Sequence, residues 1–156
     1  EIALLDACRE SNTVLVAFSP LGRAFLTGTL RDPARLEDSD MRRGMPRFSA
    51  DNYPRNLALL AEFEVLARQR ECTPAQLALA WLRGQGADVI PIPGSRTASH
   101  QEENLAAEAL TLDAGTLALI NAMMTPDQVI GARYSEAQQA DIDTEEFATA
   151  RGDGDH

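Results

Sequence analysis

Two short loops in this chain of 156 residues carry residue types that suit an anionic ligand. Ser19-Pro20-Leu21-Gly22 follows the apolar run at 14–18, and Gly94-Ser95-Arg96 precedes a predicted helix that begins near residue 98. A hydroxyl and a guanidinium at a helix N-terminus form an anion site, because the free N–H groups and the helix dipole there favour negative charge. The two loops are therefore the first candidates for a binding site.

The charge balance restricts the partners of such a site. All 14 positive side chains are arginines, the sequence has no lysine, and the formal net charge is −10. This field repels nucleic acid and anionic lipid, so we expect neither nucleic acid nor a membrane as partner. An anion can bind only through a local feature such as a helix end or a well-placed arginine. The carboxylates of Asp38 and Asp40 are expected to be solvated.

The elements that must position the loops follow an α/β pattern. The β-branched run 14–18 predicts a strand covered on both faces of a parallel sheet, and 88–92 predicts a second strand in spite of Pro91. Helices are expected over 2–10, 54–70, 74–83 and 98–107, and another from 112. Residues 27–52 form a long irregular loop that is functional or mobile. Residues 1–147 are expected to form one folded unit, followed by a disordered tail at 148–156.

Two parallel strands do not make a stable sheet alone. We therefore expect further strands from a removed N-terminal half, from a separate chain, or from self-association. The start at Glu1, within a predicted helix and without an apolar leader, also suggests that an upstream part has been removed. Cys8 and Cys72 have no metal or redox spacing, which indicates reduced thiols in a cytoplasmic protein.

Three segments together resemble the aldo-keto reductase family. Residues 16–28 resemble the family's cofactor loop, 72–81 its penultimate barrel helix, and 90–96 followed by 102–105 its second cofactor segment. The resemblance covers residues 1 to about 142. It implies the C-terminal portion of a (β/α)8 TIM barrel, with strands 7 and 8 and their helices, incomplete as given. Phosphates in such barrels bind at the loops after strands 7 and 8.

The resemblance also implies an NADPH site. Phe18 matches the aromatic residue that stacks on the nicotinamide, and the pyrophosphate contacts and the adjoining groove fall on Ser19, Leu21, Gly22 and Leu26. The adenosine half of the cofactor falls on the second segment: Gly94, then Ser95 and Arg96 at the 2′-phosphate, and His100, Glu103 and Asn104 near the adenine. The alternatives remain a core phenylalanine, a turn without a ligand, and solvated helix charges.

The catalytic residues of the family are not found in this sequence. The resemblance implies an Asp, a Tyr, a Lys and a His from the first half of the barrel, and neither Tyr53 nor Tyr134 matches that motif. We expect no catalytic residue and no metal site here. The expected parent is an NADPH-dependent oxidoreductase that reduces a small aldehyde or ketone to an alcohol. The alternative is a non-catalytic, nucleotide-binding regulatory or interaction protein of the same family.

Overall fold

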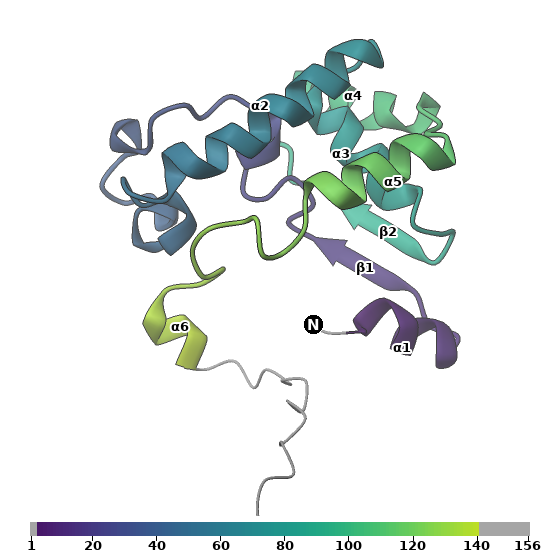
Figure 1. Cartoon of the computed structure of the whole chain (residues 1–156), viewed down its shortest axis with the longest axis horizontal. Coiled ribbons are helices and arrows are strands. Elements are labelled where there is room, and N and C mark those ends of the chain that lie inside the picture. The colour runs from purple at the N-terminus through teal and green to yellow at the C-terminus, as the bar shows by residue number, and fades with distance from the viewer. Residues whose placement is uncertain (1–2, 141–156) are drawn as a thin grey trace, which may run out of the picture.

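The computed structural model describes residues 3–140 and shows two parallel strands, with the helices of residues 53–123 grouped above them and the first and last helices below (Figure 1). Strand β1 (Leu15–Phe18) pairs with β2 (Val89–Ile92), and Leu15 lies opposite Val89. The α-helices within these residues are α1 (Leu4–Glu10), α2 (Tyr53–Gln69), α3 (Pro74–Arg83), α4 (Ala98–Ala106), α5 (Ala114–Met123) and α6 (Glu136–Ala140). The α/β pattern expected from the sequence is thus confirmed, whereas α6 was not predicted.

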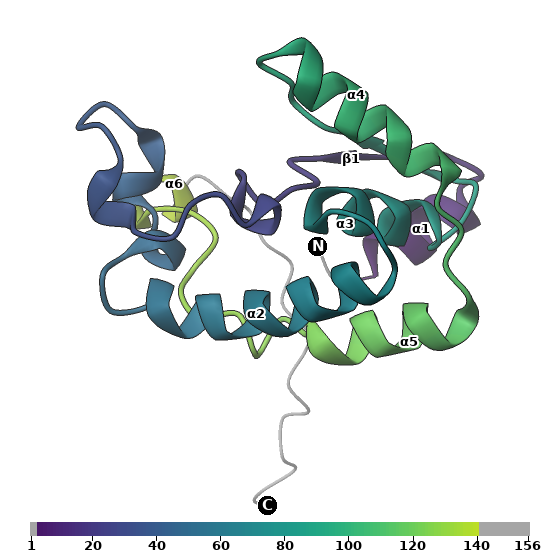
Figure 2. The same cartoon turned by 90° about the horizontal axis from the view of Figure 1, so that it is seen from above.

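Helix α3 lies at the centre of the fold, between α4 on one side and α2 and α5 on the other (Figure 2). It contacts β2, α4 and α2, so it connects the sheet to the rest of the core. The main core lies among α2, α3 and α5. Its fully buried members are Leu60, Phe63, Leu66, Ala67, Leu77, Ala78 and Ile120.

The sheet is covered on one face only, so the prediction of a strand buried on both faces was wrong. Alternate residues point to opposite faces. Val89 is buried and Leu15 half-buried on the face toward α3. The other face exposes half of each of four apolar side chains, namely Val16, Phe18, Ile90 and Ile92.

Pro91 is compatible with β2 because of the register. The Leu15 N–H donates to the Asp88 carbonyl at 2.8 Å. In a parallel sheet, the backbone N–H and C=O groups of one residue point toward one neighbouring strand, and those of the next residue point the opposite way. Position 91 therefore points away from β1, where proline loses no ladder bond. The N–H of Val89 points the same way and donates to the Gly86 carbonyl at 3.2 Å.

Residues 27–52 are not structureless. They contain three short 3₁₀ helices, Pro33–Arg35, Met41–Gly44 and Pro46–Phe48. Met45, Phe48 and Tyr53 form a second buried cluster, in which the Phe48 and Tyr53 rings stack with centroids 5.6 Å apart. The loop therefore has a small core of its own, against the N-terminal end of α2.

A capping box begins α3. The Thr73 hydroxyl accepts from the Gln76 N–H at 3.2 Å, and the Gln76 side chain accepts from the Thr73 N–H at 3.0 Å. Thr73→Ala is expected to lower the free energy of unfolding by about 1 kcal/mol, because a helix donor loses its partner. Urea unfolding measures this loss. Thr73→Ser keeps the hydroxyl and is the control, and equal stability of the alanine and serine variants would contradict the prediction.

Candidate functional site

The loop after β1 turns sharply through left-handed backbone. The φ angles are 49° at Ser19, 57° at Gly22, 56° at Arg23 and 67° at Ala24. This region is unfavourable for residues that carry a Cβ, so the surrounding contacts must hold the turn in this conformation. The turn is closed by the Gly22 N–H, which donates to the Ser19 carbonyl at 2.9 Å.

The loop after β2 leads into α4, whose N-cap is Thr97. The Thr97 hydroxyl accepts from the His100 N–H at 3.2 Å, and Asn104 donates to the Ser95 hydroxyl at 3.0 Å. Helix α4 is fixed to α3 through Gln76, whose side-chain amide donates to the Glu103 carbonyl at 3.2 Å. Gln76, the partner of Thr73 in the capping box of α3, thus also positions α4.

The two loops and α4 enclose a cavity of about 380 Å³. The predicted site residues that line it are Ser19, Leu21, Gly94, Arg96, His100, Glu103 and Asn104. Both loops lie at the C-terminal ends of parallel strands, the usual location of ligand sites in α/β folds. Arg96 brings a guanidinium to the N-terminus of α4, so this end of the cavity suits an anion.

Four predicted residues lie outside this cavity. Ser95 lines a neighbouring cavity of about 600 Å³ between α4, α3 and β2. Leu26 packs against the main core instead of lining the groove. Gly22 shapes the turn, and Phe18 exposes 53% of its surface on the uncovered face of the sheet.

Arg23 lines the cavity and was missed from the sequence. Its carbonyl oxygen accepts from Arg42 at 3.3 Å, and its guanidinium donates to the Arg133 carbonyl at 3.3 Å. The only signal in the sequence was an arginine directly after a turn glycine. Thr27 and Thr29 also line the cavity, and they come from the end of the same loop.

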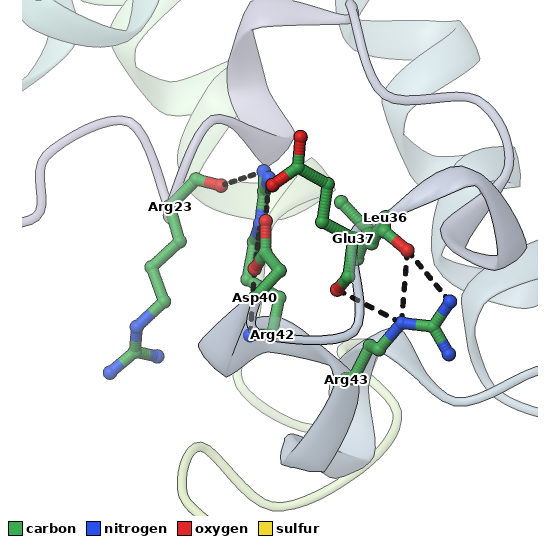
Figure 3. A network of polar contacts seen from close by, with 6 residues as sticks. All are labelled: Arg23, Leu36, Glu37, Asp40, Arg42 and Arg43. Atoms are coloured by element: carbon green, nitrogen blue, oxygen red, sulfur yellow. Dashed lines mark hydrogen bonds and ion pairs between the residues drawn. The ribbon is translucent and has the colours of Figure 1, made fainter.

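Asp40 and Arg42 form a paired unit beside this loop (Figure 3). Arg42 donates to Asp40 from Nε at 2.9 Å and from Nη2 at 2.7 Å, and its Nη1 reaches the Arg23 carbonyl. The expectation that Asp40 is solvated was wrong, since only 22% of its side chain is exposed, whereas Asp38 is fully exposed. The hydrogen bonds from Arg42 lower the pKa of the Asp40 carboxyl to about 2.

The family is decided by sequence comparison. Residues 1–124 match the model of the aldo/keto reductase family. The chain belongs to that family.

Two relatives in the aldo/keto reductase family are similar along most of this chain. Aldo-keto reductase yakc [NADP(+)] of Schizosaccharomyces pombe is 42% identical over 134 residues, which are 86% of this chain and 39% of the relative. Aldo-keto reductase str7 of Strobilurus tenacellus is 36% identical over 147 residues, 94% of this chain and 44% of the relative. The chain therefore spans about two fifths of the length of these relatives.

Solved structures support the fold of this aldo/keto reductase chain. The glycerol dehydrogenase AKR11B4 from Gluconobacter oxydans has a TM-score of 0.70 at 26% identity, over 77% of this chain and 36% of the other. Gox0644 in its apo form has a TM-score of 0.53 at 23% identity, over 85% of this chain and 37% of the other. The second comparison bears on the fold alone.

The described part of this aldo/keto reductase chain has neither a membrane-spanning helix nor a cluster of metal ligands. Among residues 3–140, no helix combines the length and the apolar character that a bilayer crossing requires. In the same range, no group of three or more His, Cys, Asp or Glu side chains could hold a metal ion.

The Asp40–Arg42 pair predicts an acid-sensitive contribution to the stability of this aldo/keto reductase chain. Because the folded pKa lies below the unfolded value, the contribution is full above the unfolded pKa, about 3.9, and is lost as the pH falls through the folded value. Asp40→Asn should therefore lower the urea midpoint by a constant amount at neutral pH. The difference from wild type should shrink as the pH falls from about 4 toward 2. A difference that stays unchanged down to the acid limit would contradict the prediction.

Proposed function

We propose that this chain is the cofactor-binding part of an NADPH-dependent oxidoreductase that reduces small aldehydes or ketones to alcohols. One observation carries the proposal: the loops after β1 and β2 meet in one cavity, and Arg96 lies at the N-terminus of α4 beside it. The printed name of the S. pombe relative includes NADP(+), which supports the same cofactor.

The residues around the cavity have the chemistry that this cofactor needs. Arg96 and the first N–H groups of α4 would hold the 2′-phosphate, since charge-assisted bonds to phosphate are strong. Glu103 and Asn104 offer a carboxylate and an amide to the adenine edge. A Cβ at Gly94 would meet no atom within 4 Å, so space is open beside this glycine.

The reactive end of the cofactor would lie toward the uncovered sheet face. There Phe18 lies half-exposed at the C-terminal end of β1, and the ring face that the Arg133 guanidinium does not cover would stack on the nicotinamide. When bound, the reduced nicotinamide supplies the hydride that converts a carbonyl into an alcohol. Ser95 has a supporting role, because its hydroxyl accepts from the Asn104 amide and so orients Asn104.

We propose that the proton donor comes from outside this chain. The sequence has no lysine, and Tyr53 is 1% exposed with its hydroxyl donating to the Leu30 carbonyl at 2.7 Å. Burial raises the pKa of Tyr53, which makes it a poor proton donor. A further half of the barrel, outside these 156 residues, would supply the catalytic groups and also cover the exposed face of the sheet. Self-association is the alternative source of that cover.

The test compares binding with turnover. The purified protein is titrated with NADPH and with NADH, and NADPH consumption is then followed with a panel of aldehydes and ketones. The 156-residue chain alone should bind NADPH more tightly than NADH and should not oxidise it, whereas a protein that also carries the N-terminal half should oxidise NADPH in a carbonyl-dependent manner. Binding without turnover by a protein that carries the N-terminal half would instead favour the non-catalytic nucleotide-binding role. Absence of NADPH binding would refute the proposal.

A further inference from the structure

Arg133 and Tyr134 contact the end of β1 and the loop that follows it. The Arg133 guanidinium lies 4.9 Å from the centre of the Phe18 ring, and the Arg23 guanidinium lies 5.2 Å from the centre of the Tyr134 ring. Both distances are those of cation–π contacts. Arg23 also donates to the Arg133 carbonyl at 3.3 Å. We call residues 133 and 134 the latch.

Residues 130 and 131, which precede the latch, are held by contacts that do not involve the cavity. The Asn56 side chain accepts from the Ile130 N–H at 2.9 Å and donates to the Ile130 carbonyl at 3.0 Å. Arg47 donates to the Gly131 carbonyl at 3.2 Å. Gly131 has a φ of 94°, and a Cβ there would lie 2.8 Å from the Pro46 carbonyl carbon. The segment before the latch is therefore fixed against α2 and the long loop.

The loop that the latch contacts needs support. Gly22, Arg23 and Ala24 are three consecutive residues with left-handed φ, and two of them carry a Cβ. Arg23, the central one, is held at both ends. Arg42 donates a hydrogen bond to its carbonyl, and its guanidinium donates to the Arg133 carbonyl and lies over the Tyr134 ring. Contacts on two sides explain how an unfavourable backbone conformation persists.

We propose that the latch is a positioning element for the nicotinamide and pyrophosphate half of the cofactor site. The inference rests on the proposed NADPH function. The latch contacts Phe18 and Arg23, which lie in β1 and the loop after it, whereas Arg96 and Asn104 belong to the loop after β2 and to α4. Loss of the latch should therefore weaken binding of the whole dinucleotide and spare ligands that contain only the adenosine 2′-phosphate end.

Two ligands separate these effects. The Kd of NADPH and the Kd of adenosine 2′-monophosphate, which lacks the pyrophosphate, are measured by calorimetry on the purified protein and on Tyr134→Ala. The alanine variant should raise the Kd of NADPH about tenfold, as expected for a half-buried cation–π contact. The Kd of the monophosphate should stay within about twofold of wild type, the usual scatter for a distant change. Tyr134→Phe keeps the ring and should bind both ligands as wild type does.

The outcomes are distinguishable. If Tyr134→Ala raises the Kd of both ligands equally, or of neither, the proposed positioning role of the latch is overturned. Failure of the wild-type protein to bind either ligand would instead refute the proposed function. If Tyr134→Ala does not fold, Arg133→Gln gives the same test, because it removes the cation over Phe18 and keeps the carbonyl that accepts from Arg23. That variant should also weaken NADPH alone, and equal effects on the two ligands would again overturn the latch.

Discussion

Arg96→Ala is expected to raise the Kd of NADPH about 50-fold and to leave the Kd of NADH almost unchanged, because a charge-assisted bond to phosphate contributes about 2–3 kcal/mol. Arg96 lines the cavity at the N-terminus of α4, where the proposed 2′-phosphate would lie. NADH lacks this phosphate, so the substitution removes no charge-assisted bond from it. Titration of the variant with both nucleotides measures the change in preference.

The matched control is another arginine on the surface. Arg55 lies in the first turn of α2 and is exposed, away from the cavity. Arg55→Ala removes the same charge from the chain, so it corrects for the general change in the electrostatic field. It should leave both nucleotide affinities close to wild type. Equal weakening of NADPH and NADH by Arg96→Ala would show that Arg96 does not recognise the 2′-phosphate.

Phe63→Ala is expected to cause the largest loss of stability, about 3–5 kcal/mol, because it removes an aromatic ring from a packed core. Phe63 is 2% exposed and belongs to the cluster shared by α2, α3 and α5. Such a loss is a large part of the 5–15 kcal/mol that stabilises an ordinary domain. Urea unfolding followed by circular dichroism gives the free energy of unfolding.

Phe63→Leu is the control for this prediction. It keeps an apolar side chain of smaller volume, so its cost should stay well below that of alanine. The alanine variant should also weaken nucleotide binding in the cavity indirectly, since α3 positions α4 through the bond from Gln76 to Glu103. A loss under about 1 kcal/mol for Phe63→Ala would mean that this core relaxes around the missing ring.

The sequence predicted the elements with strong local signals. The β-branched run before Ser19 predicted β1, and the Thr73 capping box predicted the start of α3. Residues on both sides of the cavity were named because two motifs resemble the family's cofactor segments. In each case the decisive information lay within a few neighbouring residues.

Features that depend on distant contacts could not be predicted in this way. The Asp40–Arg42 pair is local, but the bond from Arg42 to the Arg23 carbonyl joins residues 19 positions apart, and no short pattern marks it. Arg23 joins the cavity and also contacts a segment 110 residues later in the chain. Helix α6 is short and polar, so no periodic pattern marks it.

The free edge of β2 has a consequence for how chains can join. At this edge position 91 is proline, which lacks an N–H, and the N–H of Val89 is already bonded to Gly86. The edge therefore presents carbonyl oxygens as acceptors and offers no free backbone donor from Val89 to Ile92. Two copies cannot extend the sheet by joining β2 to β2, because neither supplies a proton for the ladder. A strand that pairs with this edge must donate every hydrogen bond itself. The edge therefore disfavours pairing with a second copy of β2 and favours a strand that has free N–H groups.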